Sequence, residues 1–176
     1  MLAPKASRGK GKRDGVDWEA VYDEYLPRVY NYFRCLVGPQ AVAEDLTAAV
    51  FEKAWRCRDR YRAERGAIST WLFTVAKNVA KDYFRQRRWE VPLEWAGHLA
   101  NPDPVEDAVV EQEERARLAA LLARLPARER ELVALKYGAG LTNREIARLT
   151  GLSETNVGTI LHRVVQRLRE QWEEER

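Results

Sequence analysis

The chain has 176 residues, of which 45% are hydrophobic and 32% are charged, which allows one large or two small globular domains with a highly charged surface. Its formal net charge is +3, and no segment approaches the roughly 18 uninterrupted apolar residues of a membrane span. The basic N-terminus leads into no apolar signal core, so we expect no secretory signal and a cytoplasmic location.

Motifs for metal binding and catalysis are missing from the sequence. The two cysteines, Cys35 and Cys57, and the two histidines, His98 and His162, form no cluster with metal-ligand spacing. The sequence contains no glycine-rich dinucleotide motif, no phosphate-binding P-loop and no nucleophile elbow. We therefore expect no catalytic residues, no metal and no cofactor.

The charges are distributed unevenly along the chain. Residues 1–90 carry 18 Lys and Arg against 12 Asp and Glu, residues 91–115 carry one against seven, and residues 116–176 carry 11 against eight. Two basic segments on either side of an acidic one indicate two polyanion-binding domains, joined by a linker that avoids or mimics a polyanion. Residues 1–16 are interpreted as a basic flexible tail.

Two amphipathic helices are predicted first. Residues 17–37 keep a helical apolar period that Gly38 ends, and Pro27 inside it predicts a kink or a break near Leu26. A second apolar stripe runs through residues 40–61. The charged face of this second helix is either solvated or a docking surface for a partner, and its periodicity does not distinguish the two.

The predicted helix at residues 69–89 has two distinct faces. Apolar residues spaced three and four apart lie on one face, and lysines and arginines with the same spacing lie on another. Such a helix suits a nucleic-acid strand, because cations contact phosphates while an aromatic ring or an amide contacts bases. The alternative is a solvated basic face. The basic loop before it, residues 59–68, is either a pocket wall for an extruded base or an ordinary connection.

A change of composition marks residues 90–112. This segment holds three of the seven prolines and is rich in acidic residues, and residues 101–104 cannot continue a helix. We predict an acidic, proline-containing linker there. It separates two small all-α domains, residues 17–89 and residues 113–176.

The segment at residues 141–172 has the pattern of a helix-turn-helix, LTNREIARLTGLSETNVGTILHRVVQRLREQW. Ala147 is small enough for a close helix crossing, Gly151 supplies a left-handed turn, and Ser153 caps the second helix. Apolar residues bury one side of this second helix, and polar residues on its other side are available to a major groove. The pattern favours DNA binding over a simple helical hairpin.

Four motifs in this order resemble those of the extracytoplasmic-function (ECF) type of bacterial RNA polymerase sigma factor, over about residues 17–174. YDEYLPRVYNYF resembles the first helix of the family's promoter-melting domain, and AEDLTAAVFEKAW resembles its polymerase-docking helix. STWLFTVAKNVAKDYFRQRR resembles the helix for the minus-ten element, and residues 122–170 resemble the domain that binds the minus-thirty-five element. The resemblance implies an all-α fold with a sigma region 2-like bundle and a sigma region 4-like helix-turn-helix domain.

The resemblance also implies roles for individual residues and for partners. Positions that capture an unpaired non-template base or bind the melted strand are matched, together with the 59–68 loop, by Trp71, Lys77, Asn78, Lys81, Arg85, Arg87 and Arg88. The groove-facing side of the recognition helix is matched by Ser153, Thr155, Thr159, His162 and Arg163. The polymerase-docking surface is matched by Asp45, Leu46, Phe51 and Trp55. The implied partners are promoter DNA, core RNA polymerase through its large-subunit clamp helices and flap, and an anti-sigma factor.

Four positions depart from the family's pattern. Ala48 and Ala49 stand where Gln and Glu are usual in the docking helix. Gly158 and Ile160 stand where Lys and Arg are common in the recognition helix. Losing two cations is expected to lower the salt slope of upstream-element binding by about two units.

A stand-alone helix-turn-helix regulator with an N-terminal ligand or dimer domain is the alternative interpretation. It predicts tight operator binding without polymerase, as a dimer whose half-sites are one helical turn apart. The cationic stripe of residues 69–89 favours the sigma factor, because a ligand or dimer domain has no use for it. A nucleic-acid-processing enzyme is least favoured, since the sequence offers no carboxylate pair or metal cluster.

Overall fold

The structure, a computed structural model, describes residues 15–90 and 108–174, without the side chains of residues 88–90 and 108–111. The regular elements within these ranges are all helices, which confirms the predicted all-α class. None of these helices combines the length and the apolar character that crossing a membrane requires. The expected tail up to residue 14 and the expected linker from residue 91 to 107 lie outside the described residues.

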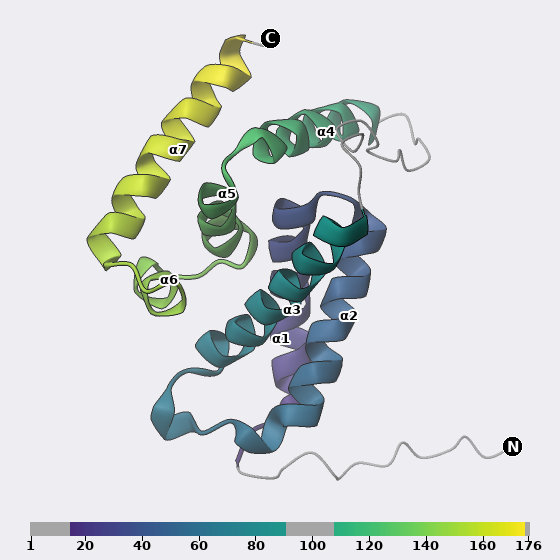
Figure 1. The fold of residues 1–176 in the computed structure, drawn as a ribbon, viewed down its shortest axis with the longest axis vertical. Coiled ribbons are helices and arrows are strands. Elements are labelled where there is room, and N and C mark those ends of the chain that lie inside the picture. Colours follow the sequence, from purple (N-terminus) through teal and green to yellow (C-terminus); the bar gives the residue numbers. More distant parts are fainter. Residues whose placement is uncertain (1–14, 91–107, 175–176) are drawn as a thin grey trace, which may run out of the picture.

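Three helices form an N-terminal bundle: α1 (Trp18–Val37), α2 (Gln40–Cys57) and α3 (Ile68–Glu90). They lie side by side in Figure 1, with α2 in contact with both neighbours. Gly38, with φ 88°, makes the turn between α1 and α2. Two short 3₁₀ turns, Arg58–Arg60 and Ala63–Arg65, connect α2 to α3.

Of the two alternatives expected near Leu26, a kink or a break, the break is wrong, because α1 runs unbroken from Trp18 to Val37 with Pro27 inside it. Proline removes the hydrogen bond to the carbonyl four residues earlier, which belongs to Asp23. Both Asp23 and Pro27 lie on the exposed side of α1, so water can satisfy that carbonyl. The opposite side of the same turn is held by packing, because Tyr25 and Val29 are buried.

The bundle core contains residues of the predicted apolar periods together with Ala43 and Phe73, which those periods do not include. α1 and α3 meet through large side chains with no exposed surface, and the small residues of α2 allow close approach. The fully buried members are Val29, Tyr32, Phe33, Ala43, Val50, Leu72, Phe73 and Ala76. The core therefore fixes which side of α3 is left for function.

The C-terminal part consists of α4 (Ala108–Arg124), α5 (Ala127–Val133), a π-helical turn η3 (Ala134–Gly138), α6 (Asn143–Thr150) and α7 (Glu154–Glu174). Helix α4 begins at Ala108, inside the segment that its composition assigns to the linker. The side chain of Arg117 on α4 donates to the carbonyl of Trp172 on α7 and lies 4.1 Å over its ring. This contact ties the two ends of the C-terminal part together.

Helices α6 and α7 form the predicted helix-turn-helix. Thr142 and Glu145 form a reciprocal capping box at the start of α6, and Gly151 turns the chain with φ 73°. Ser153 caps α7 as predicted, because its Oγ accepts a hydrogen bond from the Asn156 amide at 3.1 Å.

The two helical parts pack against each other, which the sequence pattern does not predict. Their buried apolar side chains form one continuous cluster. Helix α1 contacts η3, α4 and α5, and α3 contacts α6, so the C-terminal part covers one side of the bundle (Figure 1).

Replacement of Phe73 by alanine should lower the free energy of unfolding by about 3–5 kcal/mol, because a fully buried ring leaves a cavity in the shared core. Urea denaturation followed by circular dichroism measures this loss. Phe84→Ala, on the exposed side of the same helix, is the control and should cost about 1 kcal/mol or less. Equal losses would contradict the assignment of α3's buried face.

Candidate nucleic-acid interface

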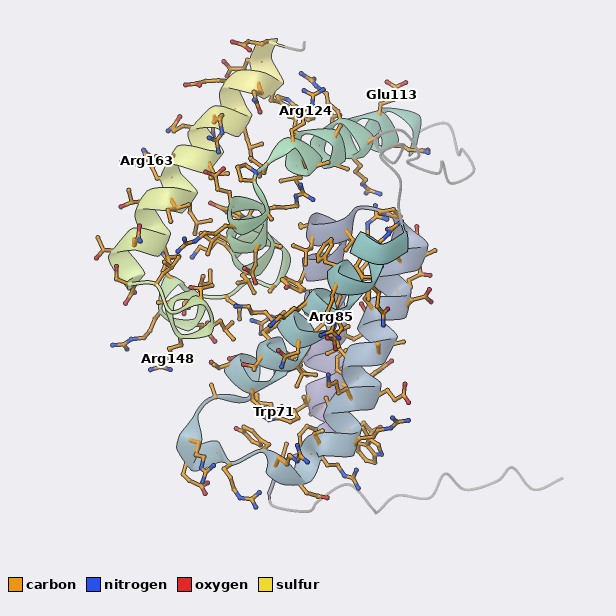
Figure 2. All side chains as sticks on the ribbon, viewed as in Figure 1. Trp71, Arg85, Glu113, Arg124, Arg148 and Arg163 are labelled. Carbon is orange, nitrogen blue, oxygen red and sulfur yellow. The ribbon has the colours of Figure 1, made fainter. Side chains whose placement is uncertain are left out.

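The N-terminal end of α3 carries an aromatic cluster that includes Trp71. Its ring centroid lies 5.8 Å from that of Trp18 and 5.6 Å from that of Tyr61. The Tyr61 hydroxyl donates to the Gly66 carbonyl at 3.2 Å and so closes the basic loop onto this cluster. Trp71 is half-buried here, so part of its ring serves packing. Figure 2 shows it at the loop end of α3.

Sequence reasoning missed Trp18 as part of this region. The aromatic richness of residues 17–37 favours core packing over a base-stacking surface, and three of the six aromatic residues of α1 are buried: Tyr25, Tyr32 and Phe33. Trp18 differs from the buried aromatic residues of α1 in its position, because it is the first residue of the helix and directly follows the capping Asp17. A side chain at the end of a helix can contact a neighbouring loop. This position at the helix end was the sequence feature that could have indicated a contact with the loop.

The middle of α3 faces the C-terminal part. Lys77 Nζ donates to the Leu149 carbonyl on α6 at 2.6 Å and lies 3.4 Å from a carboxylate oxygen of Glu131 on α5. Its side chain is only 23% exposed. Asn78 and Lys81 are exposed and line a groove of about 810 Å³ between α1, α3 and α5. These three candidates are therefore brought together, with Lys77 already occupied.

The C-terminal end of α3 carries the arginines. Arg85 lies 3.0 Å from Asp82, an exposed pair that contributes little to stability. Arg87 stacks 5.3 Å from the Tyr83 ring centroid and donates to its hydroxyl. The side chain of Arg88 lies outside the described residues. Arg87 also lines the groove with Lys77, Asn78 and Lys81, whereas Trp71 and Arg85 lie outside it.

A second link between the two parts lies near the start of α6. The buried Ser69 donates from Oγ to Glu145 Oε1 at 2.6 Å, while Glu145 Oε2 accepts from the Thr142 amide and hydroxyl at 2.8 Å. Burial acts to raise the pKa of the Glu145 carboxyl, but these hydrogen bonds more than offset it and the pKa lies below its ordinary value. The carboxylate therefore stays charged in this contact near neutral pH.

The predicted duplex-reading face of α7 is open. Its five candidates, Ser153, Thr155, Thr159, His162 and Arg163, are all exposed. Arg163 projects from the side of α7 that faces away from the bundle (Figure 2). Thr159 Oγ1 donates to the Thr155 carbonyl at 3.0 Å, so its hydroxyl is partly engaged within the helix.

The two unusual positions of α7 turn towards the protein. An ideal Cβ at Gly158 would lie 3.4 Å from the side-chain nitrogen of Asn143 on α6. Ile160 is half-buried and packs against the shared core. The glycine thus sits at the α6–α7 crossing and the isoleucine contributes to packing, a role that a cation would fill poorly.

The predicted docking surface on α2 is partly available. Asp45 and Trp55 are exposed, and Arg58 lies 4.2 Å over the Trp55 ring. Phe51 is half-buried and pairs with the exposed Tyr22 of α1 at 4.8 Å, a neighbour that sequence reasoning did not include. These residues define an exposed aromatic patch: Tyr22, Phe51 and Trp55.

Leu46 differs from the other docking candidates because its side chain is buried in the bundle core, with 9% exposed. In this structure it holds α2 in place and presents no surface to a partner. The described residues also contain no group of three His, Cys, Asp or Glu side chains that could hold a metal ion.

Two sigma-factor families match this chain. The Sigma-70 region 2 family matches residues 21–90, and the Sigma-70 region 4 family matches residues 115–168. The ECF RNA polymerase sigma factor SigL of Mycobacterium tuberculosis is 30% identical over 162 residues, which cover 92% of this chain and 92% of the relative. The ECF RNA polymerase sigma factor BldN of Streptomyces coelicolor is 32% identical over 171 residues, but the match spans only 63% of that relative's length.

Solved structures have the same fold. The sigma factor RpoE of Bartonella quintana, solved with the anti-sigma factor NepR, has a TM-score of 0.69 at 23% identity over 91% of this chain and 99% of its own. CnrH, solved with the cytosolic domain of CnrY, has a TM-score of 0.69 at 20% identity over 91% of this chain and 90% of its own. The helix-turn-helix and the cationic α3 fit a promoter-binding protein. The chain belongs to the ECF RNA polymerase sigma factors, which direct the polymerase to promoters.

Replacement of Trp18 by alanine should speed amide hydrogen exchange in residues 58–67 by about three- to tenfold, because an aromatic pair contributes about 0.5–1.5 kcal/mol. Mass spectrometry of the exchanging peptides measures this. Trp172→Ala, which removes an aromatic ring on α7, is the control and should leave the loop unchanged. A loop that exchanges at the same rate in both variants would show that the cluster does not hold it.

Proposed function

We propose that this sigma factor uses residues 17–89 to dock on core RNA polymerase and hold the melted minus-ten strand, and residues 113–176 to read the minus-thirty-five duplex. The observation that carries the proposal is the order of elements: α2, the cationic helix α3 and the capped helix-turn-helix follow one another, and the matches to Sigma-70 region 2 and region 4 cover them in that order. The chain performs no chemistry itself, and acts in the cytoplasm by positioning the polymerase.

Single-strand capture would use α3 along most of its length. The aromatic cluster at Trp71 and the loop closed by Tyr61 offer a stacking surface, where each base contributes about 1–3 kcal/mol. Asn78 and Lys81 lie further along the same helix, and Arg85 and Arg87 follow. This sequence of groups supports a strand that runs along α3, with its phosphates on the cations.

Duplex reading would use the outer face of α7. The side chains there are short hydroxyls near the N-terminus of the helix and a histidine and an arginine one to two turns later. Helix N-termini favour phosphate, while arginine forms bidentate contacts with guanine in the major groove. Only one of the five candidates is a permanent cation, so the upstream contact is expected to depend less on salt than a lysine-rich one.

Polymerase docking would use the exposed aromatic patch and the acidic side chains beside it. Tyr22 and Trp55 remain about half exposed in the free chain. Exposed aromatic rings next to charges are typical of protein interfaces. We also propose an anti-sigma factor as a partner, since the sigma factor RpoE of Bartonella quintana, which has this fold, has been solved with one.

Run-off transcription with purified core RNA polymerase and a promoter library tests the proposed function. We expect transcripts from templates that share two short sequence blocks, and a complex with core polymerase on a sizing column. Trp55→Ala should weaken that complex, while Trp172→Ala should not. Tight binding to duplex operators as a dimer, with no complex with polymerase, would instead identify the stand-alone regulator.

Asn78→Ala should reduce promoter opening by up to about tenfold and leave polymerase binding unchanged, because an amide contact with a base exists only after melting. Permanganate reactivity of unpaired thymines measures opening, and a gel shift measures the complex. Gln86→Ala, another exposed amide on α3, is the matched control. Equal loss of opening and of polymerase binding would assign Asn78 to the protein's own packing.

A further inference from the structure

We propose that the groove between α1, α3 and α5 is a binding site for a small amphiphile, a single hydrocarbon chain that carries one anionic head group. The groove has a volume of about 810 Å³. Small-molecule sites range from about 300 to 1,000 Å³. The inference goes beyond the proposed function, which includes no small-molecule ligand.

The floor of the groove is apolar. Helix α1 contacts both α3 and α5, and its C-terminal end lines the groove with the buried Leu36 and the half-buried Val37 (Figure 1). Phe84 of α3 lines it as well, with 39% of its surface exposed. A hydrocarbon chain that covers these side chains removes apolar surface from water, which favours binding.

The walls of the groove carry an excess of positive charge. Among the described lining residues, five side chains are lysine or arginine and one, Glu131, is acidic. Glu131 lies 3.4 Å from Lys77 Nζ, so its charge is balanced by that lysine. Lys81 on α3 and Arg128 on α5 are exposed on the two walls. The groove therefore favours an anion over a neutral or cationic ligand.

The Tyr32 hydroxyl is a hydrogen-bond donor that has no partner in the described part of the chain. Tyr32 lines the groove and is fully buried. Burial and, to a smaller extent, the Glu131 carboxylate raise the pKa of this hydroxyl well above its ordinary value, so it keeps its proton at neutral pH. A buried donor without an acceptor is unfavourable, and an anionic oxygen is the strongest acceptor that a ligand can bring.

These three features together select the class of ligand. A purely apolar compound would leave the Tyr32 hydroxyl and the cations without a partner. A compact anion such as inorganic phosphate would leave the apolar floor uncovered. A fatty acid supplies a chain for the floor and a carboxylate for the Tyr32 hydroxyl and the cationic walls. An alkyl phosphate has the same chemistry, so the test includes both head groups.

Occupation of the groove would affect the strand-binding helix. Lys77, Asn78, Lys81 and Arg87 line the groove and are also strand-binding candidates. A bound amphiphile would cover part of them, so we expect it to compete with single-stranded DNA for α3. This consequence rests on the function proposed above for α3, whereas the binding of the amphiphile is measurable without DNA.

Isothermal titration calorimetry of the full chain with laurate, below the concentration at which laurate forms micelles, tests the site. We expect one laurate per chain. Decanoate, which is two methylenes shorter, should bind up to about 15-fold more weakly, because each buried methylene contributes up to about fourfold in affinity. Dodecyl phosphate shows which head group is preferred, and dodecyltrimethylammonium, with the same chain and a positive charge, should bind at least about tenfold more weakly than laurate.

Two variants locate the ligand. Tyr32→Phe keeps the ring and removes only the hydroxyl, so it should weaken laurate binding by about tenfold without lowering stability in urea denaturation. Tyr137→Phe, at an exposed tyrosine outside the groove, is its control. Arg128→Gln should weaken binding a few-fold, and Arg144→Gln, at an exposed arginine of α6 outside the groove, should not change it.

Each outcome decides the proposal. Absence of laurate binding, equal affinity for laurate and decanoate, or equal affinity for the anionic and cationic amphiphiles would overturn the site, and a protein partner would then be the occupant to test in the groove. Unchanged laurate affinity in Tyr32→Phe would also overturn it. Laurate that binds as expected but does not displace a fluorescent single-stranded oligonucleotide would support the site and contradict the strand-binding role proposed for α3.

Discussion

The buried face of α3 is the constraint on which the rest of the structure depends. Leu72, Phe73 and Ala76 are fully enclosed, so they fix the rotation of the helix about its own axis. That rotation directs Lys77 towards α5 and α6, and Trp71 towards the loop. A quarter turn would exchange core and cationic faces, because a helix advances about 100° per residue. The position of every candidate on α3 follows from apolar packing.

Periodicity predicted those parts of the fold that are decided locally. The boundaries of α3, the Gly151 turn and the Ser153 cap depend on residues within one helical turn of each other, and all three were found as expected. The break that was expected at Pro27 as one alternative to a kink did not occur, because its cost depends on whether water reaches one carbonyl, and the sequence does not state that. Leu46 was assigned to a docking surface by family resemblance, whereas its place in the apolar stripe of α2 already indicated the core.

Contacts between residues far apart in the chain could not be predicted from the sequence. Nothing in the pattern around Gly138 indicates that it will meet Asn31, more than a hundred positions away, since a glycine near a helix end is usually a stop signal. The pairing of Trp18 with the loop at Tyr61 and of Lys77 with Glu131 has the same character. Each of these contacts joins two helices or loops whose relative positions are set by the tertiary fold. Only the three-dimensional structure therefore identifies them.

The Glu145 carboxylate has a consequence that extends beyond its own helix. One of its oxygens completes the cap of α6 and the other accepts from Ser69, so the start of the helix-turn-helix and the start of α3 share a single charged group. Loss of that carboxylate would therefore remove a helix cap and a contact between distant segments at once. A substitution at Glu145 cannot change one of these without changing the other.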